Sequence, residues 1–285
     1  MSATLLEHEP ALRLSAFLGL LGLLALWEAA RPRRARTLPR WLRWGNTLAL
    51  VALDTLLLRL LVPVLAVGLA AWAEAEGRGL FNVLGAPAWV AVIASLLLLD
   101  LLIYTQHRVF HAVPVLWRLH RVHHADTDLD VVTALRFHPV EILLSMGIKL
   151  AAVAALGAPP VAVLVFEVTL NACALFNHAN LRLPAPVDRV IRWVLVTPDM
   201  HRVHHSIHRE ETDSNFGFSL SWWDRLLGTY TPQPAAGHDA MILGQTRFRA
   251  PRDQWLDRLL LQPWRGPDAP AGRPVTPASA AASRR

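Results

Sequence analysis

The stretch APAWVAVIASLLLLDLLIYTQHRVFH, residues 86–111, joins the two patterns that decide the fold of this chain. Its first part, Ala86–Tyr104, is apolar up to Asp100 and close to the ~20 residues that a membrane-spanning helix needs. Its last part places His107 and His111 four residues apart, on one face of the same helix. The stretch therefore predicts a transmembrane helix with two candidate metal ligands just beyond one end.

Three further apolar segments predict more membrane helices, and the hydrophobic content of 53% points the same way. Ala11–Ala29 and Asn46–Ala73 are each long enough to span, whereas Val140–Phe176 is broken at residues 157–160 into two shorter passes. We expect three spans and a hairpin that either crosses the bilayer or only enters it. The predicted fold class is an all-α, multi-span helical membrane protein.

The densest basic cluster beside any span follows the first one, at residues 31–36. It predicts that this end of the span lies in the cytoplasm. Glu7 and Glu9 precede the same span, so we expect a retained helix and not a cleaved signal peptide. With this orientation the third span returns to the cytoplasm, and all histidine clusters share the cytoplasmic face.

Eleven of the 13 histidines lie between His107 and His208. Besides HRVFH at 107–111, the pattern HRVHH occurs at 120–124 and again at 201–205. Imidazole is the commonest metal ligand in proteins and suits iron, zinc and copper. A lone histidine is more often a core or surface residue, as we expect for His8 and His238, but three such clusters on apolar flanks predict a metal site.

An ordered set of motifs from Asp100 to Tyr230 resembles the fatty acid hydroxylase/sterol desaturase superfamily. The motifs are D-x3-Y-x2-H-R-x2-H (100–111), WRLHRVHH (117–124), RFHPVE (136–141), NHAN (177–180), TPDMHRVHH (197–205), NFG (215–217) and WDRLLGTY (223–230). The resemblance implies a membrane oxidoreductase with two metal ions, taken as iron, in a cytosolic histidine-rich helical cap. Such enzymes use O2 and external electrons to hydroxylate or desaturate a lipid C–H bond.

Two ions that each keep a position open for oxygen need about eight to ten donors, and the three clusters offer eight. His178 is a further candidate, and for His138 two roles stay open, metal binding or a bond to a carboxylate. The candidate ligands are His107, His111, His120, His123, His124, His138, His178, His201, His204 and His205. The residues expected to surround and orient them are Asp100, Glu141, Asn180 and His208.

We expect two iron ions, which zinc can replace on purification, with O2 as co-substrate. The sequence has no G-x-G-x-x-G, no cysteine set and no C-x-x-C-H motif, so a ferredoxin or cytochrome with its reductase is expected to supply electrons. The net charge of +6 comes from arginines beside apolar spans, which indicates lipid and membrane as partners and not nucleic acid. A histidine-rich membrane metal transporter or metal-binding protein is the alternative, although the ligands of a transporter should lie at mid-membrane.

The chain is expected to divide into N-terminal transmembrane helices (1–95), a catalytic region (96–235) and a C-terminal extension (236–285). Val187–Val196 has helical apolar spacing with arginines on the opposite face, which favours an interfacial helix. The tail is expected to be disordered from about Pro263. Small residues of the hairpin, among them Ala151 and Ala155, are expected either to line a lipid tunnel or to allow close packing of helices.

Overall fold

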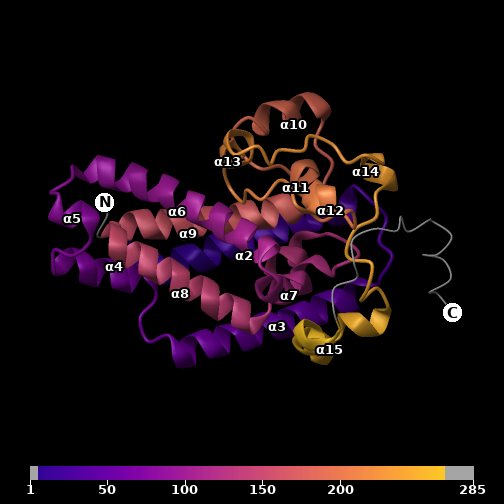
Figure 1. Cartoon of the computed structure of the whole chain (residues 1–285), viewed down its shortest axis with the longest axis horizontal. Helices are drawn as coiled ribbons and strands as arrows, with labels where there is room; N and C mark the ends of the chain where they lie inside the picture. The colour runs from indigo at the N-terminus through magenta and orange to yellow at the C-terminus, as the bar shows by residue number, and fades with distance from the viewer. Residues whose placement is uncertain (1–5, 267–285) are drawn as a thin grey trace.

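The computed structural model describes residues 6–266, which form a bundle of long helices with most of the shorter elements gathered at one end (Figure 1). In that range the only β-type pairings are two isolated bridges, Leu195–Leu220 and Ser206–Leu243, so the all-α prediction is confirmed. The elements are α2 (Glu9–Ala30), α3 (Arg40–Leu61), α4 (Ala66–Ala75), α5 (Leu80–Val83), α6 (Ala88–Ala112), α7 (Pro114–His124), η1 (Val131–Leu135), α8 (Pro139–Leu156), α9 (Pro160–His178), α10 (Ala185–Ile191), α11 (Pro198–His204), α12 (Arg209–Thr212), α13 (Trp222–Leu226), α14 (Gly237–Ala240), η2 (Pro251–Gln254), α15 (Leu256–Leu261) and η3 (Gln262–Trp264).

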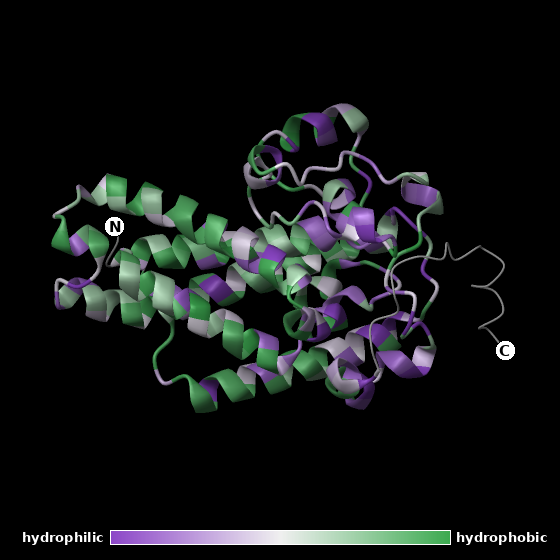
Figure 2. Ribbon diagram, viewed as in Figure 1, coloured by the Kyte–Doolittle hydropathy of each residue, from purple (hydrophilic) through white to green (hydrophobic). Residues whose placement is uncertain are grey.

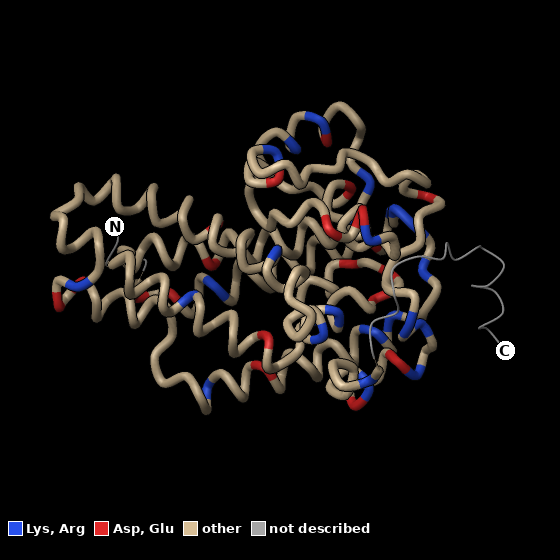
Figure 3. The backbone as a smooth tube through the Cα atoms, viewed as in Figure 1, with Lys and Arg blue, Asp and Glu red and all other residues tan. Residues whose placement is uncertain are grey.

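Five stretches among the described residues are long and apolar enough to cross a membrane. Apolar residues cover the long helices, and charged residues gather at the end that holds α7, α11, α14 and α15, which we call the polar end (Figures 2 and 3). This pattern confirms a multi-pass membrane protein. The stretches are Glu9–Ala30, Arg40–Val83, Ala88–Ala112, Pro139–Leu156 and Pro160–His178.

The expected span Asn46–Ala73 is wrong as a single helix. The structure ends α3 at Leu61 and begins α4 at Ala66. Pro63 lies between them, and it has no amide hydrogen to continue a helix and disfavours helical backbone at the residue before it. Of the two helices α3 and α4, only α3 is long enough to cross a bilayer, at about 33 Å for 22 residues.

The hairpin of α8 and α9 extends along the whole apolar part of the bundle. Its turn meets the α4–α5 turn so closely that a Cβ on Gly79 would lie 2.2 Å from the Gly157 nitrogen. Both glycines have positive φ, at 90° and 62°, which other residues adopt only with strain. Helices of 18 and 19 residues measure about 27–29 Å, close to the thickness of the hydrocarbon core. These dimensions favour a hairpin that crosses over one that only enters.

Two expectations need correction, one about which residues of the hairpin line a tunnel and one about where disorder begins in the tail. Ala151 and Ala155 are exposed on the outside of α8, so they do not line an internal tunnel. Pro263 is buried within η3, so the ordered chain continues past the expected onset of disorder. The rest of the tail, 267–285, lies outside the described residues.

Buried ion pairs hold the N-terminal helices to the rest of the chain. At the end opposite the polar end, Nη1 of Arg13 on α2 lies 2.6 Å from Oε2 of Glu167 on α9. Glu167 also pairs with Lys149 of α8. At the polar end, Arg43 of α3 binds Asp126 and Asp130, both at 2.6 Å. Charges in an apolar bundle are tolerated when paired in this way, so these contacts fix how α2 and α3 lie against the histidine-bearing elements.

Candidate metal centre

Four helices bring the histidine clusters together at the polar end. The last two turns of α6 carry His107 and His111. Helix α7 starts directly after α6 with Pro114 at its first position, where the missing amide hydrogen costs nothing because no helical hydrogen bond would be made there. The end of α9 supplies His178, and α11, capped by the Thr197 hydroxyl, supplies the last cluster. The nine histidines that these elements bring together are all buried, none more than 6% exposed.

The nine histidines form two adjacent groups. The five-histidine group comprises His107, His111, His120, His124 and His204; the four-histidine group comprises His123, His178, His201 and His205. In each group one ring nitrogen per residue lies within 4.8 Å of all the others. Each HRVHH cluster contributes to both groups, so two ions would share the same helices.

The spacing of the nitrogens fits metal ions of ordinary size. The Nε2 atoms of His107 and His120 are 3.1 Å apart, and those of His111 and His124 are 3.2 Å apart. In the four-histidine group, Nε2 of His178 lies 3.1 Å from Nε2 of His123 and of His201. Two nitrogens bound at about 2.0–2.1 Å to one ion, at angles of 90–110°, are about 2.9–3.4 Å apart.

Buried ring nitrogens without hydrogen-bond partners also indicate an ion. Among the described residues, His204 Nε2 and both ring nitrogens of His205 have no partner. An unsatisfied buried polar atom costs about 1–3 kcal/mol, and a bound cation would satisfy the nitrogens that point into the groups. The residues present therefore fit two ions, one in each group.

Five of the histidines are oriented through the nitrogen that points away from the groups. The Nδ1–H groups of His107, His204 and His178 donate to the carbonyl oxygens of Phe216, Ser214 and Ala174, each at 2.7 Å. His120 Nδ1 lies 2.6 Å from Glu141 Oε1, and His111 Nδ1 lies 3.2 Å from Asp213 Oδ1. Such bonds leave Nε2 as the lone-pair nitrogen that faces the metal position.

The electrostatic environment keeps the imidazoles neutral. Burial lowers the pKa of His120 to about 3, and burial together with neighbouring histidines lowers the pKa of His123, His124, His204 and His205 well below 6.5. A metal binds only the unprotonated ring. The fold therefore presents its donors in the form that coordinates at neutral pH.

Four residues were expected to surround and orient the ligands. In the structure only Glu141 lies beside a candidate ligand, and the other three do not. Asp100 Oδ2 accepts hydrogen bonds from Trp223 Nε1 at 2.8 Å and from the Leu220 amide, so it holds the loop after α12 to α6. His208 is half-buried at the start of α12, with no side-chain cap bond. Asp213 was missed because no cluster contains it, and the carbonyl partners have no signature in the sequence.

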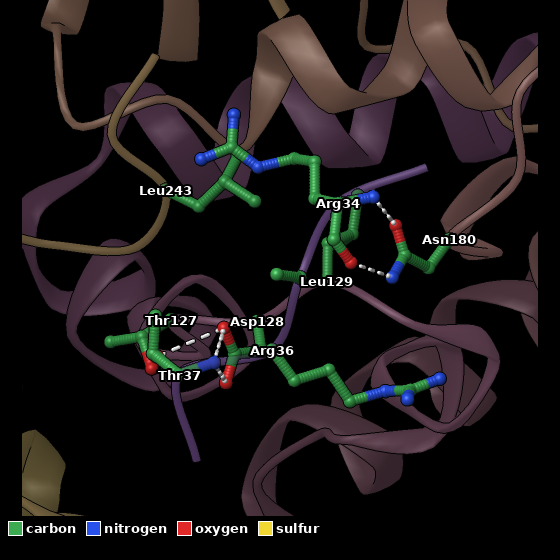
Figure 4. Close-up of a pocket in the computed structure, with 9 residues that line it drawn as sticks. Arg34, Arg36, Thr37, Thr127, Asp128, Leu129, Asn180 and Leu243 are labelled. Atoms are coloured by element: carbon green, nitrogen blue, oxygen red, sulfur yellow. Dashed lines mark hydrogen bonds between the residues drawn. The ribbon is translucent and has the colours of Figure 1, made fainter. Parts of the chain in front are cut away.

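Asn180 supports the site indirectly. Its amide pairs with the backbone of Arg34, accepting from the nitrogen at 3.0 Å and donating to the oxygen at 2.9 Å (Figure 4). On the opposite side of the same small cavity, Asp128 accepts from the Thr37 and Leu38 amides. The 31–38 loop is thus fixed to the chain two residues after His178.

His138 lies outside both histidine groups. Its Nδ1 accepts from the Val140 amide at 3.2 Å, and its Nε2 donates to the Leu260 carbonyl at 3.2 Å. It therefore starts α8 and binds the C-terminal extension, and neither ring nitrogen remains for a metal. We leave His138 out of the ligand set.

The NFG and WDRLLGTY motifs build the loop that orients two ligands. The Asp224 carboxylate accepts from the amides of Phe216 and Gly217, both at 2.8 Å, and a Cβ on Gly217 would lie 2.8 Å from that carboxylate. Asn215 takes the left-handed conformation at φ 50° and donates to the Met200 carbonyl. These contacts position the carbonyls that bind His107 and His204.

Two aromatic rings lie against both groups. Phe137 stacks on His123 at 4.6 Å between ring centroids and also contacts His120. Phe218 lies 5.1 Å from His107 and 5.8 Å from His201. Both rings are half-buried, so they form apolar walls beside the two metal positions.

Comparisons with known proteins identify the region that holds these residues. The family profile "Fatty acid hydroxylase" matches residues 92–229. Ornithine lipid hydroxylase OlsE of Rhizobium tropici is 33% identical over 154 residues, which cover 53% of this chain and 45% of OlsE. Human alkylglycerol monooxygenase is 29% identical over 60% of this chain and 36% of its own length, and human cholesterol 25-hydroxylase is 29% identical over 48% and 50%.

The chain thus spans half or less of the length of these three relatives. No solved structure matches it. The profile match contains all nine grouped histidines, together with Glu141 and Asp213. Residues 92–229 of this chain therefore match the fatty acid hydroxylase family, as the ordered motifs of the sequence predicted.

Proposed function

We propose that this protein is a membrane-bound di-iron oxygenase that hydroxylates a C–H bond of a lipid. The observation that carries the proposal is the pair of adjacent histidine groups, buried at the polar end of an apolar bundle. Hydroxylation is favoured over desaturation because the relatives bear the names hydroxylase and monooxygenase. The ligands of a metal transporter should lie along a pathway at mid-membrane, whereas these lie at the ends of α6 and α9.

The five-histidine group and the four-histidine group would each hold one iron ion. Bound iron would supply the activation of O2 for attack on an unactivated C–H bond. Imidazoles suit iron, and ions that accept six donors would keep positions open for oxygen in both groups. Because the nine rings are neutral, bound cations would favour the ionised form of Glu141 and Asp213, whose carboxylates would then supply negative charge through two ligands of the five-histidine group.

We propose that the substrate reaches the site from the bilayer. The histidines lie directly beyond the apolar runs of α6 and α9, and each CH2 group exposed to water on another route would cost about 0.8 kcal/mol. Phe137 and Phe218 would contact an alkyl chain beside the metal positions and exclude water from it. A polar head group would remain at the membrane surface.

We also propose that the site faces the cytoplasm and receives electrons from a separate ferredoxin or cytochrome. The basic 31–36 cluster supports this orientation, because it lies on the same end of the bundle as the histidines and is bonded to Asn180. Exposed arginines on this end, Arg31 and Arg182 among them, suit an acidic redox partner.

The decisive experiment combines metal analysis with isotope labelling. Protein purified without oxygen should contain two irons per chain, and lipids from cells that express it under ¹⁸O2 should carry one labelled hydroxyl. A transporter would give no labelled lipid, and a desaturase would give a new double bond without the label. Either result would contradict the proposed hydroxylation.

A further inference from the structure

A patch of exposed apolar side chains lies outside the five candidate spans. Helix α10 has no buried residue, and the chain around it exposes Val190 by 70% and Trp193 by 63%. The nearby helix α13 exposes Leu226 by 73%. Large apolar patches on a protein surface generally mark a contact with a partner or a membrane. The patch comprises Val187, Val190, Trp193, Val194, Trp222, Leu226 and Leu227.

The two helices that carry the patch form one connected unit, residues 185–196 and 218–227, which we call the α10–α13 unit. Leu195 pairs with Leu220, and Trp222 Nε1 donates to the Trp193 carbonyl at 2.9 Å. The Ser221 hydroxyl and the Arg225 guanidinium both donate to the Arg192 carbonyl, at 2.7 and 2.9 Å. The apolar side chains are therefore exposed on a cross-linked structure and not on a frayed end.

The contacts of this unit with α6 set its height along the bundle. The Leu220 amide and Trp223 Nε1 bind Asp100, which precedes His107 by seven residues, or about 10 Å along the helix axis. The unit thus reaches from the histidine site back toward the apolar part of the bundle. Figure 1 shows α13 on the side of the polar end that faces the long apolar helices, with α10 beyond it. The unit therefore contacts α6 within the candidate span Ala88–Ala112, two residues from the exposed side chain of Leu98.

The chemistry of the unit matches the boundary between lipid and water. Tryptophan rings favour this boundary, and here Trp193 lies beneath the guanidinium of Arg225 at 4.9 Å. Arg189 is exposed on the same helix as Val190, whereas the acidic side chains Asp188 and Asp224 are engaged with Arg192 and with backbone amides. Exposed arginine beside apolar residues suits anionic head groups.

We infer that the α10–α13 unit is a membrane-contact surface that lies in the head-group layer, with Val190, Trp193 and Leu226 at the boundary of the acyl chains. The contact of the unit with α6 inside a candidate membrane span makes the bilayer the occupant. The inference depends on the membrane topology and not on the chemistry of the histidine site. It also places the loop that carries Phe218 beside the lipid from which a substrate would come.

Single-cysteine labelling tests the inference, because Cys173 is the only cysteine. In a Cys173→Ala background, Leu226→Cys and Val190→Cys are each labelled with the fluorophore NBD. The protein is reconstituted in phosphatidylcholine/phosphatidylglycerol vesicles containing lipids with a nitroxide at acyl carbon 5. Thr246→Cys, exposed at the polar end, is the aqueous control, and Leu98→Cys, exposed on α6, is the bilayer reference.

The labels at 226 and 190 should be quenched several-fold more strongly than the label at 246, and to an extent approaching that at 98. Quenching equal to that of the Thr246 control at both positions would overturn the inference, because the patch would then face water. Weak quenching, together with a disulfide-linked dimer when the unlabelled Leu226→Cys variant is treated with a mild oxidant, would also overturn it, since a second copy would be the occupant. Metal content equal to that of the Cys173→Ala parent verifies that each variant is folded.

Discussion

Replacement of Glu141 by glutamine should weaken metal binding in the five-histidine group. Glu141 Oε1 lies 2.6 Å from His120 Nδ1, and both side chains are buried. The carboxylate fixes the ring and increases the basicity of Nε2, the nitrogen that faces the metal position. Glutamine keeps an oxygen acceptor but loses the charge, whereas alanine loses both.

Loss of a carboxylate behind a histidine ligand typically costs about 10- to 100-fold in metal affinity, which is about 1.4–2.8 kcal/mol. We expect Glu141→Gln near the lower value and Glu141→Ala near the upper one. The assay is an anaerobic titration with an Fe(II) chelator that follows the iron remaining per chain. One iron should be released about 10-fold more readily than in the parent, while the second keeps its affinity.

Glu167→Gln is the matched control, because Glu167 is also a buried carboxylate but is bonded to Arg13 and Lys149, away from the histidines. It should lower thermal stability and leave iron affinity unchanged. The reasoning would be refuted if Glu141→Gln retained both irons with the affinity of the parent. Equal loss of iron in both variants would refute it too, since the effect would then be a general one on the fold.

Three further predictions concern the ligands, protonation and topology. His204→Ala should lose activity and at least one iron while remaining membrane-inserted, whereas His208→Ala should keep both; full iron in the first variant would contradict the ligand set. Because burial lowers the pKa of His120 to about 3, the unfolded chain binds more protons below about pH 6.5. The stability of the metal-free protein should therefore fall as pH drops from about 6.5 toward 3, and a melting temperature independent of pH in that window would exclude this origin. A reporter fused after Tyr230 should be cytoplasmic, and an external signal would reverse the proposed orientation.

The sequence predicted the membrane helices and the histidine clusters because both depend on local periodicity. Apolar runs of spanning length and ligands three or four residues apart are visible without any tertiary contact. The same periodicity could not show how the eight clustered histidines would divide into two groups. His123 and His124 are neighbours in the sequence, yet they belong to different groups because adjacent residues on a helix point in different directions.

Long-range hydrogen bonds explain what the sequence did not predict. Asp213 and the carbonyls of Ser214 and Phe216 reach the histidines only because the loop after α12 folds back onto α6. His138 is bonded to the carbonyl of Leu260, which lies in the C-terminal extension. The packing of this extension could not be inferred from the sequence, so the actual partner of His138 was not predicted. Pro63 by itself indicates a break in a helix. The apolar residues on both sides of it, however, led to the prediction of one continuous span, so the end of α3 was not predicted.

The N-terminal helices contribute to the site although they lie outside the family match. Glu28 of α2 accepts hydrogen bonds from the Val131 and Asn180 amides, at 2.7 and 2.6 Å, and so ties together the segments that follow α7 and α9. Arg43 binds Asp126, two residues beyond His124. A chain shortened to 92–229 would keep all nine grouped histidines but lose the partners that hold α7 and α9 in register. We therefore propose that the residues before position 95 support the candidate metal centre, through Glu28 and Arg43, as well as contributing membrane helices.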